Sequence, residues 1–140
     1  MKQRVILSIK GVQHYQEQEP ETIELVTEGV LEPTDKGWSL TYEESELTGL
    51  AGVTTNFQVE PGCVTLSRKG PLSSTMVFRE GVIHESLYRM EFGALLVTVC
   101  ANRVRYELSN AGGTIDLTYA IEIEQAAAGY IEYHLTIQPK

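Results

Sequence analysis

The chain has 140 residues, of which 42% are hydrophobic and 21% charged, and its net charge is −8. A chain of this length is expected to form one domain, residues 1–140, that buries about 70% of its unfolded surface, so a core needs neither metal nor disulfide support. The charge argues against binding to nucleic acid or to an anionic membrane, because phosphate contacts need clustered Lys and Arg and the eleven basic residues are scattered.

The N-terminal stretch does not have the pattern of a targeting signal. Its apolar piece, Val5–Ile9, is interrupted by Ser8, is followed by Lys10, and precedes no small-residue cleavage site. No apolar run approaches the roughly 20 residues that span a bilayer. We therefore expect a cytoplasmic protein in which Cys63 and Cys100 are reduced core residues rather than a disulfide.

Apolar and polar residues alternate over short runs along the chain, which is typical of half-buried β-strands. Turn residues separate the runs, and Pro61-Gly62 is the strongest of these signals. Glu80-Gly81 and Glu91-Phe-Gly93 are expected to be the bends of two consecutive tight hairpins. The expected strands, in chain order, are 5–10, 23–31, 38–43, 53–60, 64–69, 75–79, 83–90, 94–108, 115–124 and 130–138.

Four local features qualify this pattern. Gly29, inside the second expected strand, indicates a bulge or a bend. The run 94–100 is almost wholly apolar, which predicts burial on both faces or a covering element. The alternation changes phase near Ala101-Asn102, as a bulge or a short turn would cause. Residues 125–129 are expected to form a loop with a helical turn, since the segment is too short for a stable helix.

Nine or ten sequential strands with one apolar face must close or stack, because an open sheet of that size would expose a wet apolar face and two bare edges. An all-β, antiparallel up-and-down barrel meets this requirement with the fewest crossings. A two-sheet sandwich is the alternative. No helix is required.

Several pieces of the sequence are similar to the YwiB-like family of small bacterial proteins of unknown function. The resemblance covers almost the whole chain and consists of turn glycines and core positions: Gly29, Leu40-Thr-Tyr-Glu-Glu44, Arg68-Lys-Gly70, Met76-Val-Phe78 with Gly81, Tyr88 before Phe92-Gly93, and Gly113 with Tyr119. It implies a calycin-like barrel, similar in build to lipocalins and fatty-acid-binding proteins. It carries no catalytic or ligand residue to this chain.

A barrel of eight to ten strands has an interior that holds side chains or one small ligand, so the lumen is the expected binding site. Glu85 and Arg89 lie four residues apart on one strand face, and pointing inward they would orient a polar head group. We favour the alternative that this face points outward, because buried charges are rare. Tyr88, Tyr119 and Trp38 complete the candidate ligand-binding set.

A second candidate group combines arginines with tyrosines on neighbouring strands. Such residues inside a barrel would bind an anionic ligand, but we favour the alternative that the arginines lie on the surface and balance the many glutamates. The members are Arg68, Arg79, Arg103, Arg105, Tyr88, Tyr106, Tyr119 and Tyr133. Glu43, Glu44 and Glu46 are expected in a solvated loop, where a basic partner would be preferred.

No metal or cofactor is predicted. His14, His84 and His134 are far apart, and neither a nucleophile elbow nor a glycine-rich phosphate loop occurs. The leading hypothesis is a non-enzymatic barrel that binds a small amphipathic or apolar molecule in its lumen. The alternatives are an interaction module whose lumen is filled by side chains such as Trp38, with a basic or identical partner, and an enzyme using His84, Glu85 and Arg89.

Overall fold

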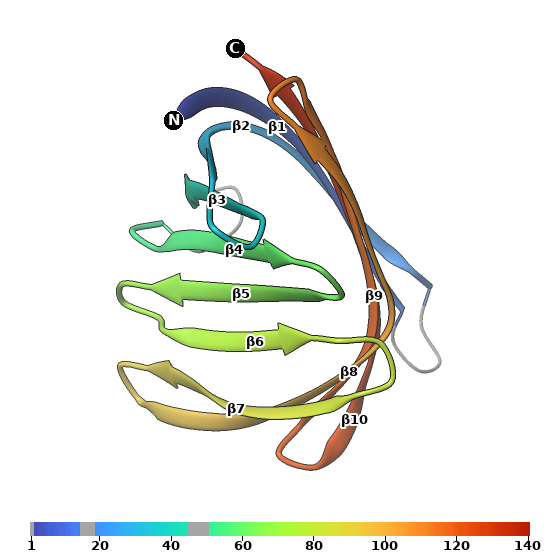
Figure 1. Cartoon of the computed structure of the whole chain (residues 1–140). Helices are drawn as coiled ribbons and strands as arrows, with labels where there is room; N and C mark the ends of the chain where they lie inside the picture. The colour runs from blue at the N-terminus through green and yellow to red at the C-terminus, as the bar shows by residue number, and fades with distance from the viewer. Residues whose placement is uncertain (1, 15–18, 45–50) are drawn as a thin grey trace.

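The computed structural model describes residues 2–14, 19–44 and 51–140, apart from the side chain of Ala127, and in these residues it contains strands and no helix (Figure 1). The ten strands are β1 (Gln3–His14), β2 (Glu21–Pro33), β3 (Trp38–Glu43), β4 (Thr54–Glu60), β5 (Cys63–Lys69), β6 (Ser74–Phe78), β7 (Ile83–Met90), β8 (Gly93–Ser109), β9 (Gly112–Ile123) and β10 (Ala126–Pro139).

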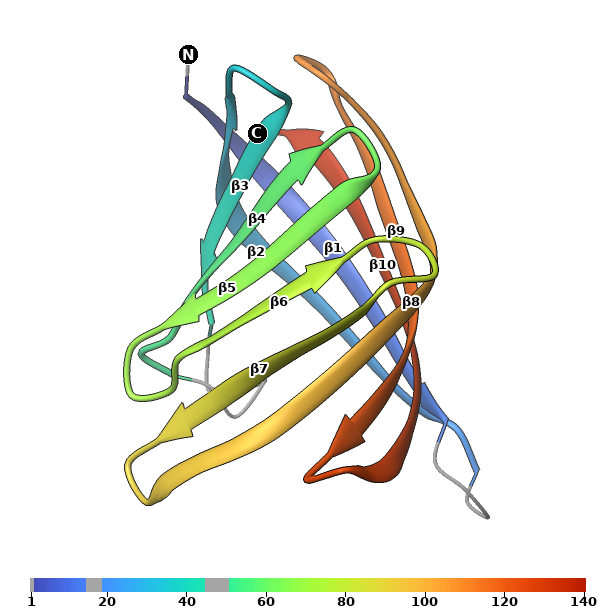
Figure 2. The same ribbon diagram turned by 60° about the horizontal axis from the view of Figure 1, so that its bottom comes forward.

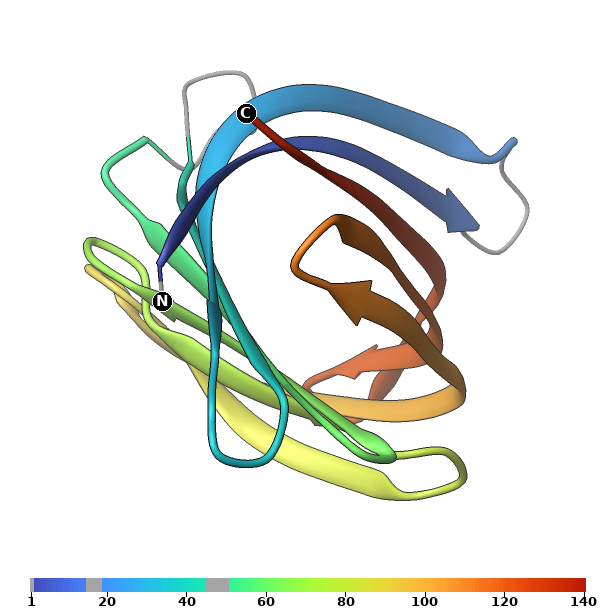
Figure 3. The same cartoon turned by 45° about the horizontal axis from the view of Figure 1, so that its top comes forward.

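All ten strands form one antiparallel sheet that curls into a nearly closed barrel (Figure 3). The order is β6-β5-β4-β3-β2-β1-β10-β9-β8-β7. The first and last strands therefore pair with each other, from Val5 opposite Pro139 to His14 opposite Tyr130. The prediction of an antiparallel barrel is confirmed.

The two free edges are β6 and β7, which follow one another in the chain and lie side by side (Figure 2). They are joined by one isolated bridge, in which Ser73 N donates to Arg89 O at 2.9 Å and Arg89 N donates to Ser73 O at 2.8 Å. The expected hairpin at Glu80-Gly81 is therefore wrong, whereas the hairpin at Glu91–Gly93 is confirmed by pairing of β7 with β8. We call the line between β6 and β7 the seam.

The connection across the seam is attached to an irregularity in β8. The register of β8 shifts between Ala101 and Arg103, which confirms the expected bulge. Gly81 N donates to Ala101 O at 2.8 Å, and Val104 N donates to the Glu80 carboxylate at 3.0 Å. Arg105 also pairs with Glu80. The bulge thus frees backbone groups that hold the β6–β7 connection in place.

The attachment at Glu80 predicts a pH-dependent part of the stability. The hydrogen bond from Val104 N–H lowers the pKa of Glu80 below its ordinary value of 4.5, and the Arg105 guanidinium makes a smaller contribution in the same direction. The folded state therefore favours the ionised carboxylate, and this stabilisation is complete above pH 4.5 and lost as the pH falls through the lowered pKa. Glu80→Gln should be less stable than wild type at pH 7, with the difference shrinking on acidification in urea titrations at several pH values.

The exposed turn residue Glu91 provides the control for this prediction. Glu91→Gln should differ from wild type by less than about 0.5 kcal/mol at pH 7, since it removes the same charge from an exposed turn. A Glu80→Gln difference that stays constant between pH 7 and strongly acidic conditions would contradict the role of the ionised carboxylate.

The core follows the predicted alternation, since every second residue of most strands is buried. The largest fully buried side chains gather in one half of the barrel: Phe57, Phe78, Leu7, Leu31, Leu40, Ile115, Leu117, Leu135 and Ile137. In the apolar run 94–100 the structure buries Val97 and Val99 and leaves their neighbours partly or largely exposed, so burial on both faces does not occur. Cys63 is a buried free thiol and Cys100 a half-buried one.

Two other local predictions are corrected. Residues 125–129 do not form a loop with a helical turn: Glu124 and Gln125 take positive φ values of 53° and 68° in a tight hairpin turn, and β10 begins at Ala126. Of the two alternatives for Gly29, the bulge is wrong, since β2 keeps its register with β1 and β3 there, and the bend stays a prediction. The lack of a side chain at Gly29 serves close approach, because a Cβ would lie 2.8 Å from Thr41 O.

Gly113, near the start of β9, pairs with Leu108 of β8 and Ile137 of β10 and has almost no room for a side chain. Its φ is +144° and an added Cβ would lie 1.8 Å from Glu107 O, so any side chain must displace the backbone of the neighbouring strand. We expect Gly113→Ala to destabilise the fold by about 3 kcal/mol in urea unfolding. Gly62 is the matched control, with φ +72° and nothing within 4 Å of the added Cβ. Gly62→Ala should cost only about 1 kcal/mol, and equal losses would contradict the steric explanation.

Candidate functional site

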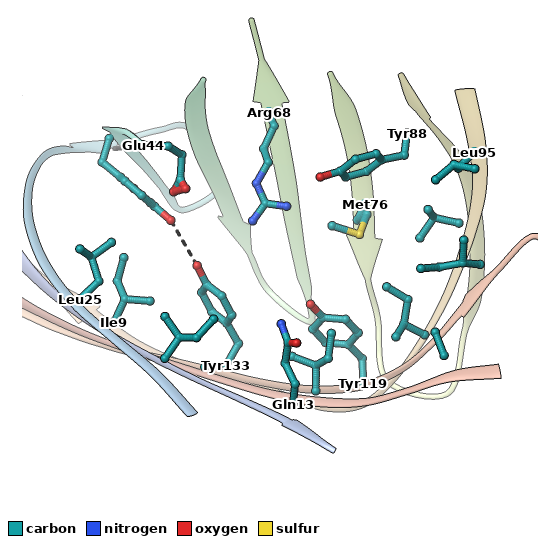
Figure 4. A pocket seen from close by; sticks show the side chains of 18 residues that line it. Ile9, Gln13, Leu25, Glu44, Arg68, Met76, Tyr88, Leu95, Tyr119 and Tyr133 are labelled. Atoms are coloured by element: carbon teal, nitrogen blue, oxygen red, sulfur yellow. Dashed lines mark hydrogen bonds between the residues drawn. The ribbon is translucent and has the colours of Figure 1, made fainter. Parts of the chain in front are cut away.

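The half of the barrel that the large core side chains leave unfilled contains a cavity of about 480 Å³ (Figure 4). It lies towards the end where β1 finishes and β10 begins, as shown by Gln13 and Ile131 in its wall. It reaches the surface beside Ile23 and Ile123, which are 44% and 38% exposed. One half of the lumen is therefore filled by side chains and the other half is open. This arrangement lies between the two alternatives from the sequence, a ligand-binding lumen and a lumen filled by side chains.

Three tyrosines, which we call the tyrosine floor, separate the cavity from the packed half of the core. Tyr42 and Tyr119 are buried, and Tyr133 is half-buried. Tyr42 and Tyr133 join their hydroxyls in a 3.2 Å hydrogen bond. Both rings pack on Phe57, with centroid distances of 6.4 Å and 5.9 Å. Tyr119, the third member, packs on Phe78 at 4.6 Å. The floor thus presents phenol groups to the cavity and ring surfaces to the core.

The tyrosine floor is uncharged at physiological pH. Burial raises the pKa of Tyr42, Tyr119 and Tyr133 above the ordinary value of 10. For Tyr42 the neighbouring Tyr133 and the Glu44 carboxylate add to this increase. The positive charge of Arg68 acts in the opposite direction on all three pKa values without reversing the effect of burial. The phenols can therefore donate hydrogen bonds to a ligand.

Two charged side chains enter the cavity above this floor. The Arg68 side chain extends from β5 towards Tyr119 and Tyr133, and the Glu44 carboxylate lies beside Tyr42 (Figure 4). Glu44 is only 8% exposed. The Arg68 Nε is buried and has no hydrogen-bond partner in the described part of the chain. A buried guanidinium nitrogen without a partner is costly, so this group is available to a ligand.

The opposite wall is aliphatic and comes from the long strands β1, β2, β8, β9 and β10. Its main members are Ile9, Leu25, Val97, Ile121 and Ile131. Met76 and Tyr88 complete the side that carries Arg68 (Figure 4). The cavity consequently has an apolar face and a polar face, a division suited to an amphipathic molecule.

The structure separates the five sequence-predicted site residues. Tyr88 and Tyr119 line the cavity, as proposed from the sequence. Glu85 and Arg89 are exposed on the outer face of β7, so the outward alternative is correct for this pair. Trp38 is half-buried against the packed core and does not line the cavity.

The larger group of arginines and tyrosines is divided in the same way. Arg68 lines the cavity together with Tyr88, Tyr119 and Tyr133, whereas Arg79, Arg103 and Arg105 are exposed and Tyr106 packs on the core. His84 is half-buried and its Nδ1 accepts from Val77 N at 3.4 Å across the seam. His84, Glu85 and Arg89 therefore do not converge on the cavity as the enzyme hypothesis requires.

Among the ionisable residues that line the cavity, the sequence interpretation missed Tyr42 and Glu44. Glu44 was assigned to a solvated loop because it belongs to a run of glutamates, yet it is buried while Glu43 is exposed. Glu46 lies outside the described residues. The missed signal is the phase of β3, since residue 44 continues the inward face of Leu40 and Tyr42 by one more step.

Residues 7–137 match a family described as a domain of unknown function, DUF1934. The chain belongs to the DUF1934 family. The crystal structure of the ywiB protein from Bacillus subtilis is 22% identical, covers 99% of this chain and 93% of its own, and superposes with a TM-score of 0.89. At that identity the likeness shows that the two proteins share the barrel fold. The resemblance to YwiB-like proteins is confirmed.

No curated protein matches this DUF1934 protein. Among the described residues, no helix is both long enough and apolar enough to cross a membrane. The description of the DUF1934 family, a domain of unknown function, assigns no activity.

Proposed function

We propose that this DUF1934 protein binds a small amphipathic molecule in the lumen of its barrel, without catalysing a reaction on it. The observation that carries the proposal is the buried Arg68 Nε, which has no partner among the described residues, inside a cavity of about 480 Å³. Pockets of a few hundred Å³ with apolar walls and a few polar groups are typical of small-molecule sites.

Each side of the cavity has a distinct part in this proposal. The ligand's polar head contacts Arg68 and the neutral hydroxyls of the tyrosine floor, because a guanidinium offers several donors in one plane. Its apolar body packs on the aliphatic wall around Ile9, Leu25 and Ile131. The exposed side chains Ile23 and Ile123 mark the route by which the body reaches the surface.

The proposal is tested by native mass spectrometry of the protein purified from cells that make it naturally. We expect a bound small molecule whose mass is present in the native spectrum and absent after denaturation. The same sample, stripped by denaturation and refolded, should take up an amphipathic probe with a ten-carbon chain. A native sample that carries no ligand, and a refolded one that takes up no such probe, would overturn the proposal.

A further inference from the structure

The cavity contains one acidic and one basic side chain, and this pair specifies the chemistry of the ligand more closely. Among the eighteen described residues that line the cavity, Glu44 and Arg68 are the only Asp, Glu, Lys or Arg. Both point into the same space between the tyrosine floor and the aliphatic wall (Figure 4). Neither forms an ion pair within the described part of the chain. Two opposite charges thus share a cavity without neutralising each other by direct contact.

A head group with a single charge is attracted to only one of these two side chains. A carboxylate gains the Arg68 guanidinium but brings its negative charge near Glu44, and a bare amine gains Glu44 but brings its positive charge near Arg68. Like charges in a poorly solvated site repel strongly, because the effective dielectric constant is far below that of water. A head group with both charges is attracted to both side chains and brings no net charge into the cavity.

Building on the proposed function, we propose that the ligand has a zwitterionic head, an ammonium next to a carboxylate, attached to an apolar tail. Arg68 binds the carboxylate through its planar fork of donors, and the tyrosine hydroxyls donate further hydrogen bonds. Glu44 accepts from the ammonium group. The tail lies along Ile9, Leu25 and Ile131. The chemical class is that of an α-amino acid with a long aliphatic side chain.

The test compares three probes of equal chain length by isothermal titration calorimetry at pH 7: 2-aminodecanoate, decanoate and decylamine. We expect the wild-type protein to bind 2-aminodecanoate at least about tenfold more tightly than either single-charge probe, the scale of one hydrogen bond between charged groups. Glu44→Gln should bring the affinities for 2-aminodecanoate and decanoate together. Glu43→Gln, its exposed neighbour, is the matched control and should behave as wild type.

The wild-type comparison decides the question even where a variant fails to fold, which circular dichroism will show. Decanoate binding as tightly as 2-aminodecanoate, with both lost in Arg68→Leu, would overturn the zwitterionic head and leave lumen binding in place. Unchanged selectivity in a folded Glu44→Gln variant would also overturn the zwitterionic head. Failure of all three probes to bind saturably would overturn lumen binding of such amphipaths and this inference with it.

Discussion

Replacing Arg68 by Leu is expected to abolish most ligand binding while leaving the barrel at least as stable as before. The guanidinium is held in the cavity with its Nε unpartnered by any described residue, so removing it relieves a desolvation cost. We expect the variant to be more stable by about 1 kcal/mol in urea unfolding. Affinity for the tightest of the ten-carbon probes should fall roughly 30-fold or more, about 2 kcal/mol.

Arg89→Leu is the matched control for this prediction. Arg89 is exposed on the outer face of β7, and its backbone, which a Leu retains, makes the bridge to Ser73. This substitution should change neither affinity nor stability by more than about 0.5 kcal/mol. If Arg68→Leu lost stability and binding together, Arg68 would instead be a structural residue of the barrel wall.

Phe57→Ala should produce the largest loss of stability among the substitutions considered. Phe57 is fully buried and supports both Tyr42 and Tyr133 of the tyrosine floor. Removing a buried phenyl ring costs about 3–5 kcal/mol, because the surroundings collapse only partly into the space left behind. For a protein of this size that corresponds to a decrease in melting temperature of roughly 10–15 °C, measurable by calorimetry.

Phe92 lies in the turn between β7 and β8 and is 93% exposed, so its substitution is the control for whether the stability lost in Phe57→Ala comes from the burial of the ring. Phe92→Ala should shift the unfolding free energy by less than about 0.5 kcal/mol. The loss of the Phe57 ring should also weaken probe binding, since the tyrosine floor then loses its support. Normal binding by a folded Phe57→Ala variant would show that the floor holds its position independently of the core.

The sequence predicted the strands and the barrel well because both depend on local alternation and on turns. The seam was not predictable in this way. Gly81 has the positive φ of a hairpin turn, and Val82 N donates to Arg79 O at 3.1 Å. The local sequence and backbone geometry at this turn are therefore the same as those of a turn between two paired strands. Whether β6 and β7 then pair depends on the curvature of the whole sheet, which no short segment encodes.

The candidate site shows a similar division between local and long-range information. Tyr88, Tyr119 and Trp38 are all sequence-based candidates, but only the first two line the cavity. Arg68 and Arg89 are both candidates too, and the sequence does not separate them, because a strand's inward face depends on its register and a shift of one residue reverses it. The run of glutamates around Glu44 masked the phase of β3, although the alternation from Leu40 through Tyr42 extends to it.

Because β1 pairs with β10, the order in which the chain connects the strands can be changed without changing the sheet. Lys140 N donates to Arg4 O at 3.1 Å, so a short linker could join the two ends of the polypeptide. Opening the chain between Glu80 and Gly81 would then make a circular permutant, from β7 to β6, in which every ladder joins strands that are neighbours in sequence and only the isolated Ser73–Arg89 bridge joins the two ends. The β1–β10 ladder, now between residues more than a hundred positions apart, would become a local hairpin. Such a permutant is expected to fold faster than the natural connectivity, because closing long loops slows folding.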